Sequence, residues 1–189
     1  MITLIIVDCQ NDFITGTMSV KGARNAVEEI KNFIKKHKDE IEKIVFTVDW
    51  HPYNHCSFKK YGGEWVHHCV QYTPGACIEP KLLKYIQSLE IDYEVSQKGA
   101  VEEVDELGAF DDIEFVSDEL GQRYYLDIVE VDANSDFVIC GVSNSVSSTI
   151  NNMLKETISP KVFMPGIISS DGCKLFSEFV KLNKLEKTT

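Results

Sequence analysis

Apolar residues recur along the chain in two alternating patterns, short continuous runs and longer stretches with helical spacing. A continuous β-branched run is typical of a strand buried on both faces, whereas apolar positions three and four apart are typical of a helix with one buried side. The runs predict strands at 2–8, 43–49, 92–98, 136–141 and 161–165, and the spaced patterns predict helices at 25–38, 80–89, 144–155 and 173–182.

Strands that alternate with helices predict a parallel sheet covered by helices on both faces. We therefore expect a three-layer α/β/α fold with a central, mostly parallel sheet of the Rossmann-like kind. A length of 189 residues fits a single domain that spans 1–189. Residues 112–132 follow neither pattern clearly, and they are compatible with a short helix, an extra pair of strands, or both.

Composition narrows the possible partners to small molecules. The 30 acidic residues outnumber the 19 basic ones and give a net charge of −11, which disfavours a nucleic-acid groove. No run of about 18 apolar residues occurs, so no membrane partner is expected, and the apolar start lacks the basic residues of a signal peptide. The six cysteines form no CxxC pair, which favours a reduced, cytoplasmic protein. The sequence is compatible with a homo-oligomer as well as with a monomer.

Polar residues follow several of the predicted strands. Ligands of parallel α/β sheets bind beyond the carboxyl ends of the strands, where Asp8, Asp49 and Lys98 stand, so we expect a catalytic site there. A single strand-end acid can be only a helix cap, but several converging polar groups favour chemistry. Lys98 and Asp8 can form a structural ion pair, or a base with its electrostatic partner beside a nucleophile.

Residues 49–68 have the composition of a metal site. Four of the five histidines of the chain fall in this stretch, together with two acids. Asp49 and His51, two residues apart at a strand end, can point into one site if a third ligand comes from the following loop. One aspartate and two histidines with open positions suit zinc, iron or manganese. The alternative is a loop with exposed histidines, and their concentration favours the metal.

The turn at 140–154 is where a nucleophile is expected. A strand that runs into a helix presents backbone N–H groups that can stabilise an oxyanion. Four serines crowd this turn, at positions 143, 145, 147 and 148. Serine and asparagine are also favoured helix caps, which is the alternative interpretation.

Four segments of the chain together resemble a known family. They are IIVDCQNDF (5–13), TVDWHPYNHCSF (47–58), EWVHHCVQYTPGA (64–76) and KGAVEEVDELGAF (98–110). In this order they resemble the motifs of the isochorismatase-like cysteine hydrolases, and within them the nicotinamidases, also called pyrazinamidases. The resemblance extends from residue 1 to about residue 180 and implies the isochorismatase-like variant of the expected fold.

The resemblance implies a role for each matching position. The implied catalytic residues are Asp8 and Lys98, and the implied metal ligands are Asp49, His51 and His68, with Glu64 or His55 adding a ligand or holding a metal-bound water. Phe13 and Trp65 match the residues that sandwich a pyridine ring, and Val142 and Ser143 match the substrate-binding turn. Val66 stands where the family usually has proline.

The chain departs from the family at the nucleophile. The family turn reads G-[VIL]-[AS]-x-x-x-C-V-x-x-T, with a cis peptide bond that would here join Val142 to Ser143. Six residues after Gly141 stands Ser147, which we take as the nucleophile position, whereas alignment from the end of the motif gives Ser145 and a turn two residues short. A modified cysteine omitted from the sequence, an engineered Cys→Ser change and natural loss all remain open. A serine hydroxyl is much less acidic than a thiol.

The resemblance implies hydrolysis of nicotinamide to nicotinate and ammonia through a cysteine thioester. Zinc is the first expectation for the divalent metal, with iron or manganese as alternatives, and it would bind the pyridine nitrogen and orient the ring. One alternative is another amide hydrolase of the superfamily, such as a carbamoylsarcosine amidase or isochorismatase relative, which typically lacks the metal motif. The other is a catalytically inactive metal-binding protein that kept the pocket.

Overall fold

A six-stranded parallel sheet forms the centre of the protein. The computed structural model describes residues 1–119 and 121–189. The strand order is β3-β2-β1-β7-β8-β9, and every neighbouring pair is parallel. The strands are β1 (Ile2–Val7), β2 (Ile41–Asp49), β3 (Tyr93–Lys98), β7 (Asp136–Val142), β8 (Lys161–Ile168) and β9 (Lys187–Thr188).

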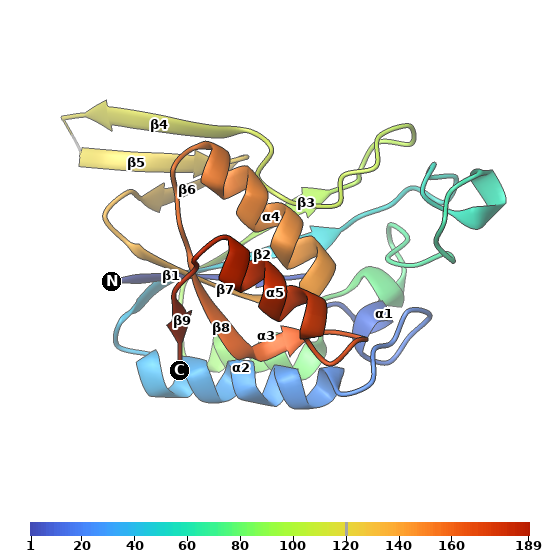
Figure 1. The fold of residues 1–189 in the computed structure, drawn as a ribbon, viewed down its shortest axis with the longest axis horizontal. Helices are drawn as coiled ribbons and strands as arrows, with labels where there is room; N and C mark the ends of the chain where they lie inside the picture. The colour runs from blue at the N-terminus through green and yellow to red at the C-terminus, as the bar shows by residue number, and fades with distance from the viewer. Residues whose placement is uncertain (120) are drawn as a thin grey trace.

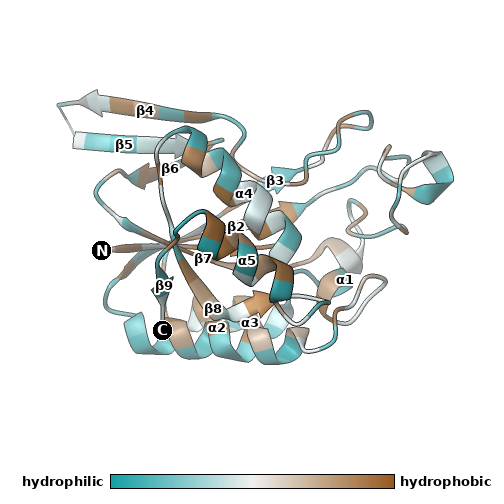
Figure 2. Ribbon diagram, in the orientation of Figure 1, coloured by the Kyte–Doolittle hydropathy of each residue, from teal (hydrophilic) through white to brown (hydrophobic). Residues whose placement is uncertain are grey.

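Helices cover both faces of this sheet, as the alternating pattern predicts. On one face lie α2 (Ala23–His37) and α3 (Pro80–Ser88), and on the other lie α4 (Ser143–Lys155) and α5 (Lys174–Leu182) (Figure 1). The strands are mostly apolar and the outward side of α2 is hydrophilic (Figure 2). Every residue of β1 is buried, so this strand runs through the middle of the core. The three-layer α/β fold expected from the sequence is confirmed.

The order of the strands creates a crevice between β1 and β7. The chain proceeds from β1 to β2 and β3 on one side of the sheet, and later from β7 to β8 and β9 on the other. Ligands of open α/β sheets bind at this reversal, outside the carboxyl ends of the strands. Gly141 has φ 123°, and a Cβ there would lie 2.0 Å from the carbonyl oxygen of Val7. Glycine therefore lets the ends of β1 and β7 approach closely.

Most of the described residues in 112–132, a stretch that the sequence left open, form strands. A second, antiparallel sheet contains β4 (Ile113–Asp118), β5 (Gly121–Leu126) and β6 (Val129–Asp132), in that order. Its base packs into the core through Leu126, Val129 and Val131. The remaining short elements are the one-turn helix α1 (Asn11–Ile14) and the 3₁₀ turns at Lys59–Tyr61 and Pro74–Ala76.

The structure also shows the state of the cysteines and the character of the helices, two properties that the composition raised. All six cysteines are free thiols, and Cys9, Cys69 and Cys140 are buried in the interior. The helices within residues 1–119 and 121–189 all lack the length and apolar character needed to cross a membrane.

Candidate functional site

The carboxyl ends of β2, β7 and β8 border a cavity of about 380 Å³, through Asp49, Val142 and Ile168. The loops that follow β2 and β3 extend beyond these strand ends, at the right of Figure 1. The cavity wall contains most of the residues that the sequence singled out, namely Phe13, Asp49, His51, Trp65, His68, Val142, Ser143 and Ser145. Asp8 and Lys98 are buried just behind this wall, where Lys98 contacts Asp49.

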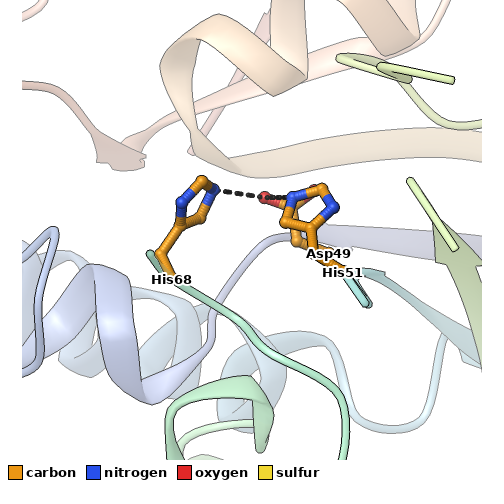
Figure 3. A group of neighbouring side chains, drawn as sticks. All are labelled: Asp49, His51 and His68. Atoms are coloured by element: carbon orange, nitrogen blue, oxygen red, sulfur yellow. Dashed lines mark ion pairs between the residues drawn. The ribbon is translucent and has the colours of Figure 1, made fainter. Parts of the chain in front are cut away.

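Asp49, His51 and His68 form a compact group of potential metal ligands (Figure 3). One ligand atom from each lies within 4.8 Å of the others, and all three side chains are buried. Nε2 of His51 is 3.6 Å and Nε2 of His68 is 3.5 Å from the same carboxylate oxygen, Oδ2 of Asp49. Two imidazoles and one carboxylate that converge in this way support a divalent metal.

The hydrogen bonds of the two histidines set their tautomers. Nδ1 of His51 lies 2.9 Å from the carbonyl oxygen of Gly99, and Nδ1 of His68 lies 2.8 Å from that of Val66. Because a carbonyl oxygen only accepts, each Nδ1 carries a hydrogen, and each Nε2 faces Asp49, where it can donate to the carboxylate when protonated or offer its lone pair to a metal when neutral. Histidines that ligate metals are held by such a second hydrogen bond. This donor set therefore fits a metal without rearrangement of the side chains.

The structure does not bring the expected fourth ligand into this group. Glu64 is exposed on a surface loop behind two glycines, where its carboxylate keeps its hydration, so its assignment as a ligand is corrected. Both ring nitrogens of His55 are occupied, Nδ1 by the hydroxyl of Ser57 at 2.8 Å and Nε2 by the carbonyl oxygen of Val104 at 2.9 Å. The ring of His55 stacks on that of His51 with 4.2 Å between centroids, and so it supports a ligand.

Lys98 lies between two buried carboxylates. Its Nζ is 3.2 Å from Oδ2 of Asp8 and forms a closer ion pair with Oδ1 of Asp49. Burial alone would lower the pKa of Lys98, but Asp49 and Asp8 hold it well above its usual range. Burial would likewise raise the pKa of Asp49, yet Lys98 and the two histidines hold it well below its usual range.

Asp8 is the least stabilised charge of the site. Burial raises its pKa to about 6 and the Asp49 carboxylate acts in the same direction, while Lys98 and the hydroxyl of Ser145 partly oppose the rise. Its backbone has φ 54°, a left-handed conformation that is uncommon for a residue with a side chain. Strain of this kind costs about 1–3 kcal/mol and is concentrated at functional sites.

The nucleophile turn differs from the sequence expectation in one residue. Ser145 is buried, lines the cavity and lies against Asp8. Ser147, the expected position, points elsewhere: its hydroxyl donates to the carbonyl oxygen of Asn144 at 2.8 Å, and it borders a different hollow. β7 ends at Val142 and α4 begins at the next residue, without an intervening loop. Ser145, the third residue of the helix, therefore reaches the cavity, where a longer turn would place Ser147.

The backbone of this turn is also simpler than expected. No peptide bond in residues 1–119 or 121–189 is cis, so the expected cis bond between Val142 and Ser143 is wrong. Val142 is extended, with φ −72° and ψ 119°, and the change of direction is made at Gly141 and Val142 with trans bonds. Val142 is also the N-cap residue, so no serine side chain caps α4.

Phe13 and Trp65 form apolar parts of the cavity wall together with Val142. Phe13 is buried and meets the ring of His68 edge-on, with 5.6 Å between centroids. Trp65 lies in the loop that carries His68 and is partly exposed. The apolar surface therefore lies next to the potential metal ligands, where a flat ring could reach both.

Two buried polar residues that sequence reasoning did not single out hold the site together. The side-chain amide of Gln10 donates to the carbonyl oxygen of Asp49 and accepts from its N–H, each at 2.8 Å. The carboxylate of Asp12 accepts from the N–H of Cys69 at 2.7 Å and so anchors the loop of His68. Both belong to the segment 5–13, whose polar residues directly after a buried strand were a usable signal.

Comparison with known proteins gives the same family as the sequence motifs. Residues 3–94 match the family model of the isochorismatase domain. This match covers just under half of the 189 residues, and it shows that the chain is similar to that family. The chain is also similar to nicotinamidases: it is 28% identical to the nicotinamidase of Saccharomyces cerevisiae over 139 residues and 33% identical to that of Escherichia coli over 95 residues. These alignments cover 60% and 42% of this chain, and 63% and 45% of the relatives, so less than two thirds of each relative is matched.

Solved structures share the fold of this chain over its whole length. The pyrazinamidase of Pyrococcus horikoshii in complex with zinc superposes with a TM-score of 0.74 at 23% identity, covering 100% of this chain and 98% of that one. The yeast nicotinamidase superposes with a TM-score of 0.76 at 21% identity, covering 100% and 99%. At such low identities the superpositions establish the fold.

Proposed function

We propose that this protein hydrolyses a nicotinamide-like aromatic amide to the carboxylate and ammonia. The observation that carries the proposal is that one cavity joins a metal-ligand group, an apolar wall and a buried carboxylate–lysine pair. The relatives support the same reaction class, since the matched proteins are nicotinamidases. A volume of about 380 Å³ is at the small end for ligand sites, which suits a single-ring substrate.

The apolar wall and the metal ligands would orient the substrate. A pyridine ring between Phe13 and Trp65 would direct its ring nitrogen toward His51 and His68. A divalent metal bound there would supply a Lewis acid for that nitrogen and fix the ring in place, and zinc is our first choice because one carboxylate and two imidazoles suit it. The zinc complex of the Pyrococcus pyrazinamidase supports that choice.

The buried pair would serve the proton transfers. Asp8 has a raised pKa, which suits a group that accepts a proton and later returns it near neutral pH. Lys98 keeps its charge and would steady the carboxylates while the proton moves. The first residues of α4 line the cavity and no side chain caps this helix, so its first N–H groups would be free to hold an oxyanion.

Ammonia release and binding together test this function. Chelated protein reloaded with zinc should bind nicotinamide by calorimetry and release ammonia from it. His68→Ala should abolish both properties because it removes a ligand, whereas its neighbour His67, whose Nε2 faces the carbonyl oxygen of Tyr53, provides the control His67→Ala. Absence of both binding and ammonia release in the zinc-loaded protein would exclude the nicotinamidase function. Binding without turnover would favour the inactive metal-binding protein.

A further inference from the structure

Ser145 occupies a special place between the cavity and Asp8. Its side chain is 5% exposed, and that remaining surface belongs to the cavity wall shared with Asp49, His51 and His68. On its other side the hydroxyl lies close enough to Asp8 to lower the pKa of that carboxyl. Both oxygens of Asp8 are buried and lack a well-directed hydrogen bond from any described residue, so this carboxylate has a free lone pair for a hydroxyl proton.

The backbone around Ser145 is arranged for an oxyanion. Ser145 is the third residue of α4, a helix of 13 residues that starts at Ser143 and has no side-chain cap. The first N–H groups of a helix have no partner within the helix, and the positive end of its dipole favours negative charge. The hydroxyl of Ser145 therefore lies near a proton acceptor, Asp8, beside the cavity, and close to N–H groups that can stabilise an oxyanion.

From this arrangement we infer that Ser145 is the nucleophile of this chain, in the place where the family carries cysteine. The inference rests on the proposed function and adds the covalent residue to it. The Ser145 hydroxyl gives its proton to Asp8 as Oγ forms a bond to the carboxamide carbon. The C–N bond then breaks, and Asp8 returns the proton to the nitrogen, so that ammonia leaves and an ester remains. Water next gives a proton to Asp8 and adds to the ester carbon, after which the Oγ–C bond breaks and Oγ regains a proton from Asp8.

The other candidate nucleophiles lack one or more of these contacts. None of the six cysteines, all of which lie in the described part of the chain, lines the cavity. The hydroxyl of Ser57 is engaged with His55, and that of Ser147 with the carbonyl oxygen of Asn144. Ser143 lines the cavity, but the serine hydroxyl that lowers the pKa of Asp8 is that of Ser145.

Trapping the covalent ester tests the assignment. Zinc-loaded protein is mixed with nicotinamide, quenched in acid and weighed intact, and the modified peptide is mapped. We expect one added nicotinoyl group on the peptide that contains α4. Ser145→Ala should lose the adduct and at least about 100-fold of the ammonia release, since nucleophile removal costs at least as much as loss of a general base. Calorimetry should show that it still binds nicotinamide.

Two further variants make the result decisive. Ser148→Ala, a change in the same turn but outside the cavity, should leave adduct and turnover unchanged. Ser145→Cys, which keeps a nucleophile, should carry the acyl group at the same position. Persistent ammonia release in Ser145→Ala, or binding of nicotinamide by the unaltered protein without adduct or turnover, would overturn this inference and leave the binding site intact. Absence of binding by the unaltered protein would instead overturn the proposed function and this inference with it.

Discussion

Lys98 balances two buried negative charges with one positive charge. It contacts Asp8 and Asp49, and all three side chains are almost completely buried. A buried charge that loses its partner is strongly destabilising, because neither water nor another ion replaces the contact. Lys98 therefore stabilises the fold as well as serving the proposed reaction, and the structural and catalytic interpretations of the Asp8–Lys98 pair do not exclude each other.

Lys98→Met should destabilise the chelated, metal-free protein by about 3–5 kcal/mol near neutral pH, the usual cost of breaking a buried ion pair. The cost should depend on pH in a defined direction. The pKa of Asp8 is already raised from 3.8 to about 6, and loss of Lys98 raises it further. A carboxyl group with a raised pKa in the folded state loses stability as pH rises through that pKa. The deficit should therefore grow between about pH 5 and pH 8, measured by urea unfolding.

An exposed lysine provides the control for this experiment. Lys161 pairs with Asp136 at 3.2 Å, and the two side chains are 32% and 62% exposed. Lys161→Met should change the unfolding free energy by no more than about 0.5 kcal/mol at either pH, as is usual for surface positions. A Lys98→Met deficit that does not vary with pH would show that lost packing, rather than the unpaired carboxylates, causes it.

Single residues also show how far the sequence leads at this site. Asp49, His51 and His68 were predictable, because ligand-type residues at a strand end and in the next loop have few alternative uses. Ser145 was not decided, since two alignments of the turn were possible and only the point where the helix begins separates them. The surface position of Glu64 depends on the path of a loop, which residue type does not reveal.

Among the strands, those with the most buried residues were the easiest to predict from the sequence. Five of the six strands of the parallel sheet were predicted within three residues of their ends, because their apolar runs are continuous. The sixth, β9, has two residues and no such run, and it was not predicted. The sheet of β4, β5 and β6 has only its base in the core, so its apolar pattern is too weak to distinguish strand from helix. The one-turn helix α1 is shorter than the period that would identify it.

The junction of β1 and β7 gives a prediction at this level. Gly141→Ala should cost several kcal/mol and lower the yield of ammonia from nicotinamide, because its Cβ would meet the carbonyl oxygen of Val7 at 2.0 Å. Gly121 is a matched control, since its φ of 125° is nearly that of Gly141 at 123°, while among the described residues no atom beyond its chain neighbours lies within 4 Å of its Cβ. Gly121→Ala should show only the backbone strain, about 1–3 kcal/mol. Equal costs in urea unfolding would argue against a steric junction.

For the molecule as a whole, metal binding and folding are coupled. The ligands come from β2 and from the loop after it, and their geometry exists only when that loop is anchored to Asp12 near the end of β1. A metal that binds this folded arrangement and not the unfolded chain must stabilise the whole protein. The net charge of −11 adds a weak general attraction for cations, so the specific effect has to be separated from it.

Zinc should therefore raise the melting temperature of the chelated protein. At a free zinc concentration 100 times the dissociation constant, linkage adds about 2.7 kcal/mol, and a chain of this size gains about 2–4 °C per kcal/mol, so a rise of about 5–10 °C is expected in calorimetry. The double variant His51→Ala/His68→Ala should lose this rise because two of the three ligands are gone. The double variant His37→Ala/His67→Ala removes the same number of histidines outside the group and should keep it. If zinc stabilised both double variants equally, the ions would be acting through the acidic surface, and the metal site at Asp49 would have to be abandoned.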